Sequence, residues 1–196
     1  GLALVVPALA GVVAYQGITN FPPEFQEIAA GNIAGIPNQV IIFAVLLILS
    51  FILLHLTKYG RKIFLIGVNR NAAEYSGIKT RVVMSTYVLS GIAASISGIL
   101  LTSYLGTAKP DFGADLTLPI ITAVVLGGTS IYGGKGNVMG TGLAALIIGF
   151  MKFGLTLIGV NAQYQDIPVG ILLILSLIIN FMIHSKVFQK IMKKNI

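Results

Sequence analysis

Residues 39–57 read QVIIFAVLLILSFILLHLT, and this stretch decides the fold class. It contains no Asp, Glu, Lys or Arg. An α-helix needs about 20 such residues to cross a hydrocarbon core of about 30 Å. Three more stretches meet the same criterion: residues 82–106, 138–160 and about 167–185. The sequence therefore predicts several membrane-spanning helices.

One apolar segment, residues 116–128 (LTLPIITAVVLGG), is too short for a normal span. Pro119 lies near its start and Gly127-Gly128 at its end. This length favours a broken or tilted helix packed among others. We expect an all-α, polytopic transmembrane helical bundle that contains this one short helix.

The composition supports a membrane protein and excludes other classes. The 196 residues are 56% hydrophobic and only 10% charged, whereas soluble domains carry about 25% charged residues. The chain has no Cys, which excludes disulfides and thiolate metal sites. The net charge of +7 does not point to nucleic acid, because no basic loop interleaves exposed aromatic residues as a nucleic-acid surface does.

The charges follow the loops in an alternating pattern. Lys and Arg dominate residues 58–81 and 129–137 and the C-terminal tail, whereas acidic residues mark 107–115 and 161–166. An excess of Lys and Arg marks the cytoplasmic side, so we expect the C-terminus in the cytoplasm. This topology requires the short segment to cross the membrane. The basic loops can also attract anionic lipid.

The loop at 58–81 contains a short predicted helix. Asn71 is a suitable N-cap, Glu74 three residues later completes a capping box, and Gly77 suits the left-handed position after a helix. Ala72 and Ala73 would give this helix a low-profile surface. The alternatives are a compact force-transmitting element and an ordinary capped connector.

Small residues recur every four positions in two predicted spans. Ser90, Ala94 and Gly98 form one face, which Gly91 and Ser95 widen. Gly140, Ala144 and Ile148 form a less complete one in the span 138–160. Such faces let helices approach closely in lipid. They are either static packing faces or surfaces along which helices slide.

The loop at 127–137 is rich in glycine but is not a phosphate-binding loop. Lys135 is followed by Gly136 rather than Ser or Thr, and Thr129 stands where the motif needs glycine. We expect a tight cytoplasmic turn whose glycines adopt positive φ. The residues concerned are Gly127, Gly128, Gly133, Gly134 and Lys135.

Lys152 is the only Asp, Glu, Lys or Arg residue inside a predicted span. An ionisable residue there is a functional candidate, so Lys152 either faces the pore or extends its ammonium toward the membrane surface. His55 and His184 lack carboxylates at ligand spacing, so no metal site is predicted. No residues are predicted to be catalytic.

Three stretches in this order carry a resemblance: GVNRNAAEYSGIKTRVV (67–83), LSGIAASISGILL (89–101) and ITAVVLGGTSIYGGKGNVMGT (121–141). Together they closely resemble permease subunits of bacterial ABC importers for ribose-like monosaccharides. The resemblance covers about residues 20–185. It implies that residues 1–196 are a single transmembrane permease domain, the C-terminal part of a longer chain. Residues 1–15 are apolar and resemble the second half of a membrane helix, which is consistent with that expectation.

The resemblance also implies a function and partners. The chain would be a non-enzymatic subunit in the bacterial inner membrane, without a cofactor, that works with two ATPase subunits, a second permease copy or paralogue, and an extracytoplasmic substrate-binding protein. The cargo would be a monosaccharide. Branched-chain amino acids or a furanosyl signalling molecule are alternatives, and a membrane-embedded enzyme is a more distant one. The residues that match the ATPase-coupling region of the family are Ala72, Ala73, Glu74, Ser76 and Gly77, with Asn71 as the predicted cap.

Overall fold

The computed structural model describes residues 17–33, 35–79, 81–109 and 113–184. The apolar start at residues 1–15, Asp111 and the lysines of the tail lie outside these ranges. The chain forms two compact units. The first comprises residues 1–49 and 79–116, and the second comprises residues 50–78 and 117–196.

The first unit holds a short helix against a long one. Helix α2 (Pro23–Ala30) begins with a proline in its first turn, where the missing N–H is not needed. It packs on α6 (Arg81–Leu105) through the buried Ser103. The Ser103 hydroxyl donates to the Phe25 carbonyl at 2.6 Å and accepts from the Ala29 N–H at 3.1 Å. Two-residue strands β1 (Asn32–Ile33) and β2 (Ile36–Pro37) form an antiparallel hairpin after α2.

The apolar stretch is helical from residue 39 to residue 56, as predicted. Helix α3 (Asn38–Phe51) continues into the π-helical segment η1 (Ile52–Leu56). The π-helical turn ends at Thr57, where the backbone becomes extended. Helix α4 (Lys58–Val68) and helix α5 (Arg70–Tyr75) follow in the predicted cytoplasmic loop.

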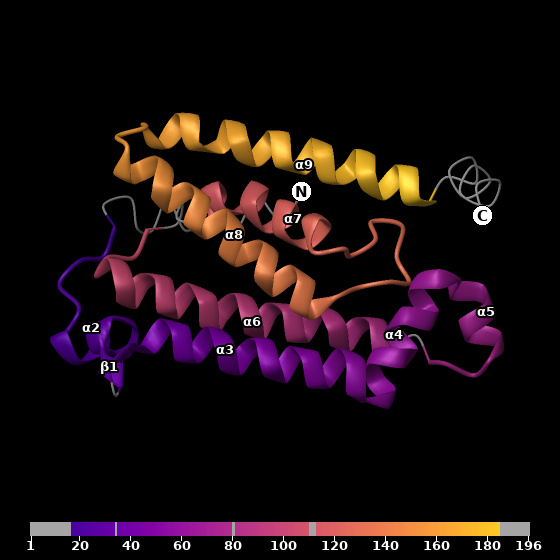
Figure 1. Ribbon diagram of the computed structural model, residues 1–196. Helices are drawn as coiled ribbons and strands as arrows, with labels where there is room; N and C mark the ends of the chain where they lie inside the picture. The colour runs from indigo at the N-terminus through magenta and orange to yellow at the C-terminus, as the bar shows by residue number, and fades with distance from the viewer. Residues whose placement is uncertain (1–16, 34, 80, 110–112, 185–196) are drawn as a thin grey trace. The chain divides into compact units, whose positions relative to one another are not determined.

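The second unit contains three helices that pack together. A 3₁₀ turn, η2 (Ala114–Leu116), leads into α7 (Thr117–Leu126), and α8 (Val138–Leu157) and α9 (Ala162–His184) follow. Both α8 and α9 pack on α7, and Figure 1 shows them meeting at their connecting turn and diverging from it. The core of this unit is Ala123, Ala144, Ile148 and Val169.

The predicted all-α membrane fold is confirmed. Four described helices are long and apolar enough to span a membrane: Asn38–Leu56, Arg81–Leu105, Val138–Leu157 and Ala162–Met182. The expected short helix is present between them and is packed against two neighbours. Whether it crosses the membrane stays a prediction.

The last span begins earlier than predicted. We expected the last span to start near residue 167, after a loop at 161–166 that Asp166 marked as acidic. The helix instead starts at Ala162 and includes Pro168. Asp166 therefore lies on a helix rather than in a loop.

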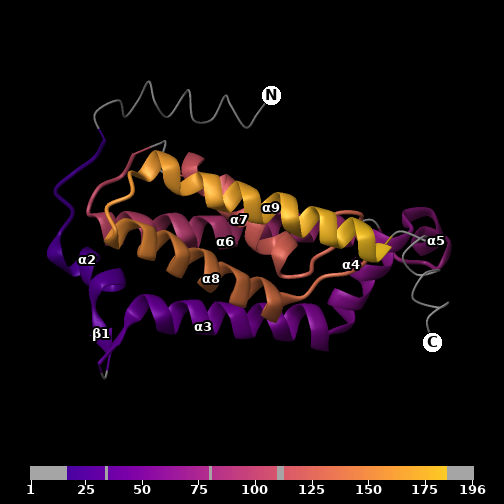
Figure 2. The ribbon, with the colours of Figure 1, turned by 45° about the horizontal axis from the view of Figure 1, so that its top comes forward.

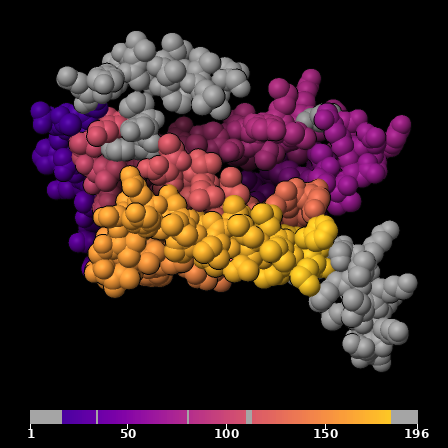
Figure 3. All heavy atoms as spheres, turned by 90° about the horizontal axis from the view of Figure 1, so that it is seen from above, coloured from indigo at the N-terminus to yellow at the C-terminus, as the bar shows by residue number. Residues whose placement is uncertain are grey.

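The two small-residue faces differ in the structure. Ala144 and Ile148 are buried in the core of the second unit, so the face on α8 is a packing face. The face on α6 is exposed, and a Cβ added at Gly91 or Gly98 would meet no atom within 4 Å. Large apolar side chains on α9, among them Ile174 and Ile178, are exposed too. Figure 3 shows the surface that α9 presents on this side of the second unit, in orange to yellow.

Candidate functional site

The backbone is extended at Thr57, between η1 and α4. Thr57 is the N-cap of α4, and its hydroxyl accepts from the Gly60 N–H at 3.3 Å and donates to the Leu53 carbonyl at 2.5 Å. Gly60 is buried directly against the Leu54 carbonyl, where a side chain would clash. These contacts hold α4 close to the end of the preceding helix.

Helix α5 has defined ends, but its N-cap differs from the predicted one. Asn69, not Asn71, is the N-cap, and its side-chain oxygen accepts from the Ala72 N–H at 3.1 Å. The helix starts two residues earlier than we expected because Asn69 Oδ1 reaches the third residue of the helix. Glu74 Oε1 lies 3.3 Å from Nε of Arg70, which stands four residues before it on the same helix.

The C-terminal end of α5 matches the prediction. Gly77 has a φ of +80°, and its N–H bonds to the Glu74 carbonyl at 2.9 Å. The Ile78 N–H bonds to the Ala73 carbonyl at 3.0 Å, which completes a glycine-ended helix terminus. The Ser76 hydroxyl donates to the Ala72 carbonyl at 2.9 Å.

The two alanines do not form a common surface. Ala73 is buried, whereas Ala72 is exposed. The expectation that both give α5 a low-profile outer face is therefore wrong for Ala73. Its methyl group faces inward because α5 packs against α4.

The glycine-rich loop adopts the tight turn that we predicted. Gly128, Gly133 and Gly134 have φ values of +88°, +89° and +76°. The Ser130 N–H bonds to the Lys135 carbonyl at 3.0 Å, which closes the loop. Buried Gly127 lies against the backbone of Gly140 at the start of α8.

The structure brings the two predicted cytoplasmic elements together. A Cβ on Gly133 would lie 2.6 Å from the Gly67 carbonyl oxygen, and one on Gly134 would lie 2.5 Å from Val68 Cγ2. Nearby, a Cβ on Gly136 would lie 3.2 Å from the Phe64 ring. Figure 2 shows α4 and α5 at the same end of the second unit as the α7–α8 connection. Backbone therefore packs on backbone here, which only glycine permits.

Two aromatic side chains on these elements are exposed. Tyr75 at the end of α5 is 94% exposed, and Tyr132 in the glycine-rich loop is 72% exposed. Ile131 beside it is also exposed. The motifs and charges of the two loops do not single out these residues. Aromatic residues within charged loops are nevertheless a usable signal, since Tyr is enriched at protein interfaces.

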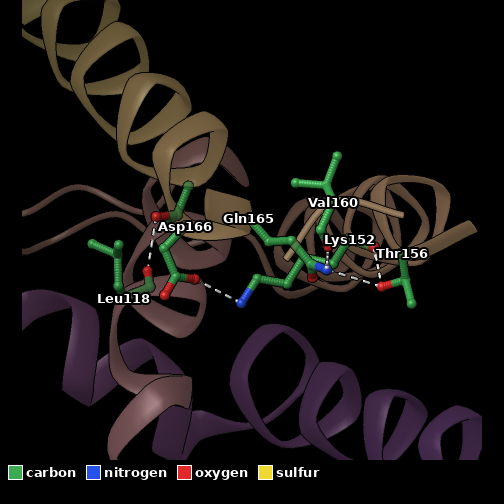
Figure 4. A network of polar contacts seen from close by, with 7 residues as sticks. Leu118, Lys152, Thr156, Val160, Gln165 and Asp166 are labelled. Carbon is green, nitrogen blue, oxygen red and sulfur yellow. Dashed lines mark hydrogen bonds and ion pairs between the residues drawn. The ribbon is translucent and has the colours of Figure 1, made fainter. Parts of the chain in front are cut away.

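Lys152 forms an ion pair with an acidic residue of the next helix. Its ammonium lies 2.8 Å from Asp166 Oδ1 (Figure 4). Gln165 Nε2 donates to the Thr156 hydroxyl at 3.1 Å and to the Val160 carbonyl at 3.0 Å. We call Lys152, Thr156, Gln165 and Asp166 the polar cluster. The sequence identified Lys152 but missed Asp166 as its partner, because Asp166 was assigned to a loop.

The cap of α5 gives a first testable prediction. Asn69→Ala is expected to lower the free energy of unfolding of the full-length protein by about 1 kcal/mol, because it leaves a helix N–H without its acceptor. Asn71→Ala, which removes another exposed amide two residues further along, is the control and should change stability by less than about 0.5 kcal/mol. Thermal melting in detergent measures both, and a larger loss for Asn71→Ala would contradict the observed cap.

Comparison with known proteins gives matches over most of the chain. The protein family described as "Branched-chain amino acid transport system / permease component" matches residues 3–177. The autoinducer 2 import system permease protein LsrD of Yersinia enterocolitica is 43% identical over 176 residues, which is 89% of this chain and 53% of the relative. LsrD of Salmonella paratyphi B is 43% identical over 175 residues, with the same coverage. The chain thus spans about half the length of these relatives. No solved structure matches.

Proposed function

The chain belongs to the permease-component family of branched-chain amino acid transport systems, and from this we propose that it forms part of the membrane-spanning subunit of an ATP-driven importer. In this proposal the chain moves cargo and catalyses no reaction. ATP is hydrolysed by a separate partner chain. Four helices of spanning length agree with a multi-pass subunit of the inner membrane.

The observation that carries the proposal is the contact of α4 with the glycine-rich loop. Gly67 and Val68 at the end of α4 lie against Gly133 and Gly134, and α5 is closed at both ends by Asn69 and Gly77. A stiff α5 can receive a push from an ATPase. The backbone contact would pass this push to the loop, and so to α7 and α8 on either side of it.

The coupling region consists of Asn71, Ala72, Ala73, Glu74, Ser76 and Gly77 together with the loop residues Gly127, Gly128, Gly133, Gly134 and Lys135. To these we add Tyr75 and Tyr132 as the contacts with the ATPase, since exposed aromatic side chains anchor protein interfaces. The two elements belong to the cytoplasmic side, and so does the C-terminus. This orientation follows from the excess of Lys and Arg.

The proposed assembly has two ATPase subunits, a second permease copy or paralogue, and an extracytoplasmic binding protein. The cargo that we favour differs from the ribose that the sequence suggested. The similar curated relatives are permeases of autoinducer 2 import systems, which supports a furanosyl signalling molecule over ribose. Branched-chain amino acids remain the alternative because of the family's description.

The test is to purify the full-length protein with its partners from its native membrane. We expect mass spectrometry to find a Walker-type ATPase and a secreted binding protein. That binding protein should retain autoinducer 2 in preference to ribose and leucine. If the binding protein retains ribose or leucine instead, that molecule is the cargo. Recovery of neither partner, from a preparation mild enough to keep complexes intact, would contradict the proposal.

A further inference from the structure

The polar cluster lies at one end of the α8–α9 hairpin. Lys152 lies five residues before the end of α8 at Leu157, and Asp166 lies four residues after the start of α9 at Ala162. At 1.5 Å per residue, both are within about 8 Å of the turn along their helices. Gly159 in that turn has a φ of +80°. In the topology proposed above, this end faces the outside.

The cluster is only half buried. The side chain of Lys152 is 28% exposed and that of Asp166 is 43% exposed. The apolar side chains of Phe153 and Leu157, on the same stretch of α8, are also exposed. Charged groups in membrane-spanning helices are stable where they meet water or protein rather than acyl chains. The open side of the ion pair therefore faces water or another protein.

The chemistry of the cluster suits hydroxyl groups. An ionised carboxylate offers about four acceptor positions and an ammonium offers three donors. The 2.8 Å contact with Lys152 is made by Asp166 Oδ1, which is buried, so the open positions are those of Asp166 Oδ2 and of the Lys152 ammonium. A sugar-like molecule can bind them without breaking the ion pair.

We propose that the polar cluster is a water-facing binding site for an uncharged, polyhydroxylated cargo near the outer opening of the transport path. Lys152 and Asp166 bind the cargo hydroxyls, and Gln165 and Thr156 fix the end of the hairpin that presents them. The cargo assignment rests on the proposed import function, whereas the exposure of the cluster to water is tested independently of it.

The absence of cysteine from this sequence allows a direct test of water access. In a full-length protein whose only cysteine is the introduced one, Thr156→Cys should react with a membrane-impermeant thiol reagent added outside. Because the reactive species is a thiolate, which needs water, we expect it to react at least about tenfold faster than Phe153→Cys, at a similar depth on the same helix. Translocation of autoinducer 2 should slow the labelling. Equal rates at the two positions would overturn the proposal.

A second variant separates cargo binding from structural support. Lys152→Met with Asp166→Leu replaces the ion pair by apolar side chains of similar size, a change that folded proteins often tolerate. In vesicles that contain the ATPase and the binding protein, we expect this double variant to assemble normally. The binding protein should still stimulate ATP hydrolysis. Uptake of autoinducer 2 should fall about 10-fold to 100-fold, as for lost hydrogen bonds to charged groups.

Ser95→Ala serves as the control, since its exposed hydroxyl bonds only within its own helix at 2.9 Å, and it should transport normally. Normal uptake by the apolar double variant would overturn the proposal. If the unaltered protein shows no stimulated ATP hydrolysis, the import function itself fails. The cysteine reactivity then still decides whether the cluster faces water. If the double variant does not assemble, the cysteine reactivity again decides whether the cluster faces water.

Discussion

Replacing Gly133 with alanine is expected to abolish transport. Gly133 has a φ of +89°, which costs a residue with a Cβ about 1–2 kcal/mol. The new Cβ would also lie 2.6 Å from the Gly67 carbonyl oxygen, so α4 and the loop must separate. We expect a loss of at least about 2 kcal/mol of stability from these two causes together. In reconstituted vesicles, any remaining ATP hydrolysis should be uncoupled from uptake.

Two other glycines serve as controls for Gly133→Ala. Gly128 has a similar φ of +88° but open space around its Cβ position, so Gly128→Ala should show the backbone strain alone. Gly149 lies in α8 with nothing within 4 Å, so Gly149→Ala should be neutral or stabilising by about 0.5–1 kcal/mol. Full transport by Gly133→Ala would show that the backbone contact with α4 does not matter for coupling.

The second large effect is expected from removing both exposed tyrosines. Tyr75→Ala with Tyr132→Ala should weaken binding of the ATPase by at least about 30-fold, because a buried aromatic anchor contributes about 2 kcal/mol or more to an interface. Both side chains are mostly exposed in this chain. Stability should therefore change by less than about 0.5 kcal/mol per substitution. Co-purification and titration of the ATPase with detergent-solubilised permease measure the change in affinity.

Tyr164→Ala is the matched control for the tyrosine pair. Tyr164 is exposed near the start of α9, which is the outer end of that helix in the proposed topology. Its replacement should leave ATPase binding unchanged. An equal loss of binding for Tyr164→Ala would contradict both the assigned interface and the orientation.

The helices that span the membrane could be predicted from the sequence because the signal is local. Apolar stretches bounded by charged loops locate α3 with η1, α6 and α8 to within about three residues. The prediction was weaker at α9, where the acidic Asp166 was assigned to a loop and the start was placed near residue 167. A proline seven residues into a helix is tolerated here.

The contacts within the candidate site depend on folding and were harder to predict. The pairing of Lys152 with Asp166 requires the short turn between α8 and α9, which places two residues fourteen positions apart side by side. The burial of Ala73 requires the packing of α5 on α4. The cap at Asn69 rather than Asn71 was decided by which amide reaches the first turn of α5. The glycine spacing predicted a turn at 127–137, but it did not predict that Gly133 contacts Gly67.

The most direct test of the central claim is site-specific cross-linking in native membranes. Single cysteines would replace Tyr75, Tyr132 and Tyr164 in the full-length protein, in which no other cysteine remains. We predict that cross-links from positions 75 and 132 capture the ATPase, and that those from position 164 do not. Capture of the ATPase from position 164, with none from positions 75 and 132, would contradict the claim that α5 and the glycine-rich loop form the coupling surface.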